Sequence, residues 1–200
     1  MKALALVCTL TPSPGRSSSE LLAKQVLTAL TIHGVETSLV RVVDHDVKPG
    51  VQTDMGDGDD WPDIRQQILS ADIVVLATPI WLGHLCSVGQ RVLERLDAEL
   101  SEKDEQGRLL TYRKVAVTAV VGNEDGAHHV TAELFQGLND VGFTIPAAGG
   151  TYWVGEAMQG KDYQDLESTP STTAETTKAL ADNAFHLAQV LGNRPYPPAA

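Results

Sequence analysis

Residues 3–22 read ALALVCTLTPSPGRSSSELL, and this stretch sets the pattern for the whole chain. Residues 3–8 are apolar almost without interruption, which is typical of a short strand covered on both faces of its sheet. Prolines and a glycine in residues 12–15 then predict a loop. Apolar residues recur every three or four positions after it, which predicts a helix that ends near Gly34: Leu22, Val26, Ala29 and Leu30.

This strand–loop–helix unit repeats along the chain. Further strands are predicted at residues 39–43, 73–77, 115–121 and 143–145, and each is followed by a helical pattern. Thr78-Pro79 is expected to end the third of the five strands, because proline cannot donate to a central ladder. Such alternation predicts an α/β fold, a doubly wound five-stranded parallel sheet of order 2-1-3-4-5 with helices on both faces.

The organisation predicted from the pattern is simple. Residues 1–192 read as a single domain, and residues 193–200 as a proline-rich tail with Pro195, Pro197 and Pro198. Residues 148–169 form a long excursion rich in glycine and aromatic residues. No apolar run approaches the ~20 residues that a membrane-spanning helix needs. The first apolar run has no signal-peptide cleavage site after it, so we expect a cytoplasmic protein.

Composition excludes several classes of protein. The 200 residues include 15 Lys and Arg against 26 Asp and Glu, a formal net charge of −11. This charge disfavours binding to nucleic acid, whose phosphates select basic faces, and docking on anionic membranes. The chain has only two cysteines, Cys8 and Cys86, so neither a disulfide scaffold nor a thiolate zinc site is expected.

The loop after the first strand is a candidate phosphate site. In doubly wound sheets ligands bind at the carboxyl ends of the strands, beside the first strand. Residues 9–19 supply hydroxyl groups and, at the helix start, free N–H groups that suit an anion. The candidates are Thr9, Arg16, Ser17, Ser18 and Ser19. The alternative is that these serines only cap the helix.

The loop after the third strand is a candidate site for a flat, partly apolar ring. It contains Pro79, Ile80, Trp81, Leu82 and Gly83. Trp81 offers a ring face, and the glycine permits close approach of the backbone. The alternative is that the large side chains are core or dimer contacts.

The loop after the fourth strand is a candidate for the other side of the same ring. Gly122, Asn123, Glu124 and Gly126 bracket this polar turn. The alternative is an ordinary strand-to-helix turn capped by Asp125.

Other polar clusters are given structural interpretations. His128 and His129 are adjacent, so on a helix they diverge by ~100° and form a poor metal pair; no metal site is expected. His84 is expected at the surface. The aspartates of residues 54–63 are expected to form a solvated loop, with Trp61 as a core anchor. GxGxxG, GxxxxGK[ST], GxSxG and HExxH are all absent from the sequence, which disfavours the corresponding nucleotide and hydrolase sites.

Together the three loops resemble the flavodoxin-like NAD(P)H-dependent FMN reductase family, as does the Tyr152-Trp-Val-Gly-Glu156 stretch. The resemblance extends to about Leu191. It implies bound FMN, with the phosphate at the first loop and the ring between the second and third. It also implies NADPH or NADH as co-substrate, a small-molecule electron acceptor, and a homodimer or homotetramer. The longer first loop departs from the family's compact form, which leaves the role of Arg16 open.

The sequence therefore predicts an FMN-dependent oxidoreductase that takes hydride from NAD(P)H and passes electrons to a flavin, a quinone or a similar acceptor. The chemistry would be the flavin's, so no side chain is assigned a catalytic role. The alternatives are a non-enzymatic flavodoxin-type electron carrier and a flavodoxin-fold assembly module with an altered site.

Overall fold

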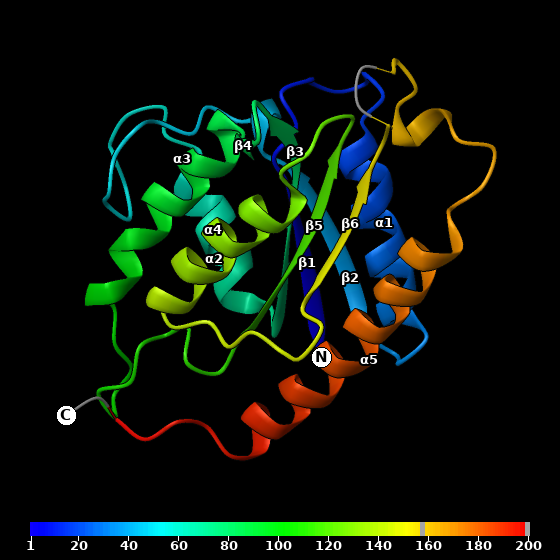
Figure 1. Ribbon diagram of the computed structural model, residues 1–200. Coiled ribbons are helices and arrows are strands. Elements are labelled where there is room, and N and C mark those ends of the chain that lie inside the picture. Colours follow the sequence, from blue (N-terminus) through cyan, green and yellow to red (C-terminus); the bar gives the residue numbers. More distant parts are fainter. Residues whose placement is uncertain (157–158, 199–200) are drawn as a thin grey trace.

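A parallel sheet between two layers of helices forms the molecule (Figure 1). The computed structural model describes residues 1–156 and 159–198. The parallel strands are β1 (Lys2–Val7), β2 (Glu36–Arg41), β3 (Ile73–Trp81), β5 (Val115–Gly122) and β6 (Gly150–Val154). Their order is β2-β1-β3-β5-β6, and the two-residue strand β4 (His84–Leu85) pairs antiparallel with the end of β3. The predicted five-stranded parallel order is confirmed, because β5 and β6 are its fourth and fifth strands.

Helices cover both faces of the sheet, as predicted. Helices α1 (Ser18–Thr31) and α5 (Ser171–Asn193) cover one face. Helices α2 (Trp61–Ser70), α3 (Ser87–Leu96) and α4 (Ala127–Asp140) cover the other, with Trp61 fully buried as expected. Successive residues of β1 alternate between the two cores: Leu4 and Leu6 pack under α2–α4, and Ala5 and Val7 under α1 and α5. This two-sided burial explains the unbroken apolar runs of the strands.

The fifth strand lies later in the sequence than predicted. Phe143–Ile145 makes only an isolated bridge to the start of β5, through Thr144 and Val115. The chain then leaves the ladder at Pro146 and rejoins it at β6, where Gly150 pairs with Thr118. The prediction at 143–145 was therefore wrong, because a proline interrupts the ladder after one bridge. The excursion predicted at residues 148–169 contains the edge strand.

Strand β3 continues past Pro79, contrary to the prediction that it ends at Thr78-Pro79. Strand β1 stops pairing with β3 at Ala77, whose carbonyl accepts a hydrogen bond from the Cys8 N–H at 2.7 Å. In a parallel sheet every second residue of a strand bonds to the same neighbouring strand, so the N–H of residue 79 would point to the side of β1, as the backbone of Ala77 does. Because β1 no longer pairs there, the N–H that proline lacks is not needed for the ladder. On the other side β5 continues to Val121, opposite Pro79.

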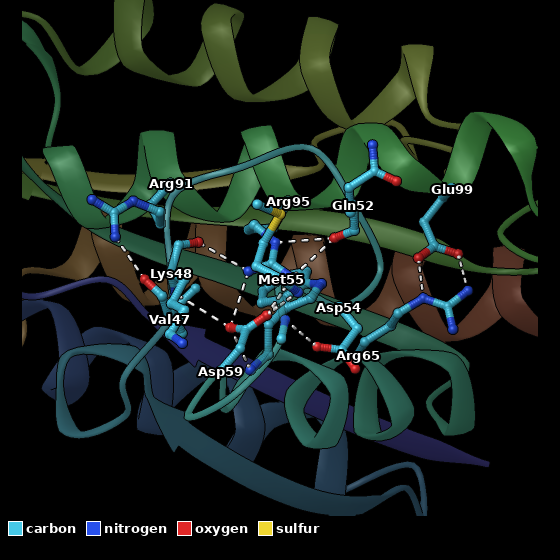
Figure 2. A network of polar contacts seen from close by, with 12 residues as sticks. Val47, Lys48, Gln52, Asp54, Met55, Asp59, Arg65, Arg91, Arg95 and Glu99 are labelled. Atoms are coloured by element: carbon cyan, nitrogen blue, oxygen red, sulfur yellow. Dashed lines mark hydrogen bonds and ion pairs between the residues drawn. The ribbon is translucent and has the colours of Figure 1, made fainter.

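A buried ion pair of Asp59 holds the loop between β2 and α2 (Figure 2). The aspartates expected to be solvated are exposed at positions 54, 57, 60 and 63, and the expectation was wrong for Asp59 alone. The side chains of Arg95 and Asp59 are 0% exposed, and their closest contact is 2.8 Å. Arg95 also donates to the carbonyls of Lys48 and Gln52. Asp59 accepts from backbone N–H groups as well, including that of Met55. The buried Arg95 guanidinium thus anchors the loop to α3 at several points.

The end of the chain packs back on the body. The Tyr196 ring lies edge-on to that of Tyr112, with centroids 5.7 Å apart. Helix α5 runs to Asn193, one residue past the predicted domain boundary at 192. The division into a domain at 1–192 and a tail at 193–200 stays a prediction. Among the described residues, no helix combines the length and the apolar character needed to cross a membrane.

Candidate functional site

Four loops meet at the carboxyl ends of the parallel strands (Figure 1). They follow β1, β3, β5 and β6, and their described residues are 8–17, 82–83, 123–126, and 155–156 with 159–170. The first three contain most of the predicted site residues. Side chain-to-backbone bonds and close backbone contacts connect the loops to one another, as described below.

The start of α1 offers unpaired N–H groups. Ser17 is the N-cap, and its hydroxyl accepts from the Glu20 N–H at 3.3 Å. Within residues 1–156 and 159–198, no protein acceptor bonds to the N–H groups of the four residues before Glu20: Arg16, Ser17, Ser18 and Ser19. The helix dipole adds positive character at this point. The Ser17 hydroxyl satisfies only one of the donors at this helix start, so capping by serine leaves the others unpaired. A phosphate could accept hydrogen bonds from several of them.

The hydroxyl groups around this helix start differ in their contacts. Ser19 is buried, and Ser18 accepts from the Gln164 N–H at 3.3 Å. Thr9 is buried at the end of β1, and its hydroxyl accepts from the Thr11 N–H at 3.3 Å. Thr9 therefore shapes the loop through its side chain.

Arg16 points to the loop after β6. Its guanidinium donates to the Gln164 carbonyl at 2.6 Å and pairs with Asp165 at 3.0 Å. The Arg16 side chain is 70% exposed, so the bond to Asp165 is a weak surface ion pair. In this arrangement Arg16 connects the loop after β1 to the loop after β6. The residues that line a hollow beside α1 include Gly15, Ser17, Arg41 and Gln164.

Arg41, which sequence reasoning missed, supports the first loop from β2. Its buried guanidinium donates to the carbonyls of Thr11 at 3.2 Å and Gly15 at 2.8 Å, and it pairs with Glu20. Burial alone would raise the pKa of Glu20, but bonds from Lys24 and Arg41 outweigh it and lower that pKa. The available signal was a lone charge in the otherwise apolar run at residues 39–43.

The loops after β3 and β5 fit tightly against each other. Leu82 has φ of +53°, and its N–H donates to the Glu124 carboxylate at 2.7 Å. A Cβ on Gly126 would lie 2.8 Å from the Gly83 Cα, so the two backbones touch. A Cβ on Gly122 would lie 2.9 Å from the Ile80 side chain. Close packing explains these glycines better than polar chemistry does, against backbone at Gly126 and against a side chain at Gly122.

The polar side chains of the third loop are bound within the protein. Asn123 donates to Asp162 at 2.5 Å, and the Gly122 carbonyl accepts from the Gly155 N–H at 2.8 Å. Helix α4 has Gly126 as its N-cap, so the alternative with Asp125 as the cap was wrong. Asn123 and Glu124 therefore fix the loops through their side chains, and their backbone groups remain the part that can face a ligand.

Large apolar side chains are exposed at this edge. Trp81 is 55% exposed and Leu82 is 88% exposed, whereas Ile80 beneath them is buried. Leu10 after β1 and Tyr152 and Val154 on β6 are exposed as well. An edge that combines unpaired N–H groups with exposed aromatic and aliphatic surface fits a flat ring that carries a phosphate. The assignment of individual cofactor contacts to the predicted residues remains a proposal.

Comparisons with known proteins agree with this geometry. Residues 1–159 match the family model described as NADPH-dependent FMN reductase. The chain is 34% identical over 208 residues to the 8-demethyl-8-aminoriboflavin-5'-phosphate synthase of Streptomyces davaonensis, covering 98% of this chain and 80% of that protein. It is 36% identical over 198 residues to a Mycobacterium bovis protein named divalent metal cation transporter MntH. The chain spans only 29% of the length of that second relative.

Solved structures extend the likeness to three dimensions. A crystal structure of RosB with bound 8-demethyl-8-formylriboflavin-5'-phosphate matches with a TM-score of 0.88 and 33% identity, covering 98% of this chain and 82% of that one. A Streptococcus pneumoniae flavodoxin matches with a TM-score of 0.55 and 14% identity, over 93% of this chain and 99% of the flavodoxin, which shows the flavodoxin-like fold alone. By its family match and by its identity to a relative of which it covers 80%, this flavodoxin-like chain belongs to the NADPH-dependent FMN reductase family of enzymes.

Proposed function

We propose that this enzyme binds FMN at the carboxyl edge of its sheet and uses it to oxidise NADPH or NADH. The observation that carries the proposal is the row of unpaired N–H groups from Arg16 to Ser19 at the positive end of α1. A phosphate placed there accepts several hydrogen bonds without displacing a protein partner. The 14-residue helix behind them contributes its dipole.

The remaining predicted residues would hold the ring. Trp81 offers an apolar face, and the end of β3 with the turn after it would lie along one edge of the ring: Pro79 and Ile80 at the end of β3, then Leu82 and Gly83. The loop from Gly122 to Gly126 lies along another, and its Glu124 carboxylate fixes the turn at Leu82. When bound, FMN supplies hydride and single-electron chemistry. The chain's own contribution is to bind, orient and shield it, so no side chain is assigned to acid–base catalysis.

The electrons would pass to a small acceptor, such as free flavin or a quinone. Leu82 and Trp81 are exposed beside the proposed ring site. Apolar exposure of this kind suits a nicotinamide or acceptor ring, or a second copy of the chain in a homodimer or homotetramer. We propose both roles for the same surface.

Two measurements test the proposal. Flavin fluorescence is titrated with protein, and the FMN-loaded enzyme is then mixed anaerobically with NADPH or NADH. Quenching on binding and rapid bleaching by one nucleotide are expected. FMN fluorescence that protein leaves unchanged would refute the binding site. Bleaching that requires an added reductase would support the electron-carrier alternative.

A second candidate function is chemical modification of a riboflavin 5'-phosphate substrate. The 34% identity to a synthase named for such a flavin, over 98% of this chain, favours it. The flavin recovered after aerobic turnover distinguishes the two functions. An unchanged mass supports the reductase, whereas the gain of one oxygen and loss of two hydrogens, as when O2 oxidises a ring methyl group to formyl with release of water, supports the synthase.

A further inference from the structure

We propose that His84, His129 and Glu133 form a binding site for a divalent transition metal of the Zn²⁺ class. His84 lies on β4, just after the exposed loop at Trp81–Gly83. His129 and Glu133 lie one turn apart on α4. The site is independent of the proposed flavin chemistry and uses none of the residues assigned to FMN.

The three ligand atoms converge on one point. The His129 Nε2 lies 3.2 Å from the His84 Nδ1, and 3.2 Å from the Glu133 Oε1. The His84 Nδ1 lies 3.4 Å from the same oxygen. Zinc bonds of about 2.0–2.1 Å place tetrahedral ligands about 3.3–3.4 Å apart, so the triangle of ligand atoms already has the required size.

The donor set selects the kind of cation. Two imidazole nitrogens and one carboxylate suit zinc and its neighbours in the transition series, whereas Ca²⁺ and Mg²⁺ prefer oxygen donors throughout. A cation on this triangle lies slightly outside the plane of the three atoms, because their common centre is only about 1.9 Å from each. Its outer side faces solvent, since His84 and His129 are 64% and 52% exposed. Water or an anion would complete the coordination.

Local structure already orients the ligands. The Leu85 N–H donates to the second Glu133 oxygen at 3.3 Å, which turns the first oxygen toward the two rings. The spacing of four residues between His129 and Glu133 puts both on one helix face. His128 faces elsewhere, toward the Tyr152 hydroxyl at 3.1 Å. Adjacent histidines were thus the wrong pair to consider, since the partner of His129 comes from a strand 45 residues earlier.

A bound metal would tie the β3–β4 hairpin to α4. That hairpin contains Trp81 and Leu82, which are 55% and 88% exposed. The metal would therefore act as a clip that stiffens one wall of the carboxyl edge.

The test uses the whole chain after removal of metal with a chelator. Zn²⁺ is titrated calorimetrically, and Co²⁺ is added separately because its visible absorption reports the ligand geometry. His84→Ala and Glu133→Gln are compared with His128→Ala, a control on the same helix, and with the distant His186→Ala. All four residues lie at or near the surface, and circular dichroism verifies that each variant folds.

We expect one Zn²⁺ per chain and a tetrahedral-type Co²⁺ spectrum. Zn²⁺ at 100 times its Kd should raise the Tm by roughly 5–10 °C. Each ligand variant should weaken Zn²⁺ binding by more than the ~10–100-fold that loss of an outer-shell partner causes. Both controls should bind as the wild type does. The proposal would be overturned if the wild type did not bind Zn²⁺, or if His84→Ala and Glu133→Gln bound Zn²⁺ as tightly as the wild type. FMN titrations of the same variants separate this outcome from failure of the proposed function.

Discussion

Replacing Arg95 with methionine should destabilise the protein far more than the same replacement of an arginine at the surface. All five N–H groups of Arg95 are used: two bonds reach the Asp59 carboxylate, two reach the Gln52 carbonyl and one reaches the Lys48 carbonyl. Arg95→Met removes them together and leaves a fully buried carboxylate. Loss of one partner of a buried ion pair costs about 3–5 kcal/mol. For a chain of this length, that corresponds to a fall in Tm of roughly 6–20 °C.

Urea denaturation of a double-mutant cycle measures the effect. Arg95→Met, Asp59→Asn and the double variant are compared with Arg91→Met, which removes one bond to the Val47 carbonyl at 2.6 Å. The control should lose about 1 kcal/mol, the usual net contribution of one hydrogen bond. The double variant should lose much less than the sum of the single losses, because the two groups act as a unit. Additive losses, or an Arg95→Met loss as small as that of Arg91→Met, would refute the reasoning.

Three further perturbations are informative. Ser17→Ala combined with Ser19→Ala should weaken FMN binding by roughly 1–3 kcal/mol in a fluorescence titration, and unchanged affinity would place the phosphate elsewhere. Gly126→Ala should lower the Tm more than Gly56→Ala does, because both have positive φ but only the first would force a Cβ against backbone at 2.8 Å; equal losses would contradict the contact. Burial alone would raise the pKa of Asp59, but bonds from arginine and backbone N–H groups outweigh it and hold that pKa well below its usual value. The stability this carboxylate contributes is therefore present above about pH 4, the unfolded value, and is lost as pH falls toward the folded one. Urea midpoints measured from pH 7 down to pH 3 should fall less steeply for Asp59→Asn than for the wild type, and parallel curves would contradict this.

The strands that could be predicted are those buried on both faces. The apolar runs that begin at Ala3, Ile73 and Val115 need no partner to be recognised, and right-handed crossovers then restrict their order. The edge strand could not be placed in this way. Residues 150–154 are only partly buried, so they lack an unbroken apolar run, and the more apolar segment before Pro146 was chosen instead.

The loops that form the candidate site could be predicted from the sequence, but the contacts of their side chains could not. A parallel sheet brings the ends of its strands together whatever the residues are, which explains why the predicted loops meet. The roles of Asn123, Glu124 and Arg16 depend on partners 39, 42 and 148 residues away. Arg41 was missed for the same reason, since its partners lie in the preceding loop and helix.

The contact between Gly83 and Gly126 constrains how this protein can vary. Position 126 has no room for a methyl group, because a Cβ there would lie 2.8 Å from the Gly83 Cα, so a larger residue in the loop after β5 is tolerated only if the loop after β3 shifts with it. Loop grafts intended to alter acceptor preference should therefore exchange both segments as a unit. Libraries that replace Gly126 in the loop after β5 alone would mostly sample variants in which this loop no longer fits against the loop after β3.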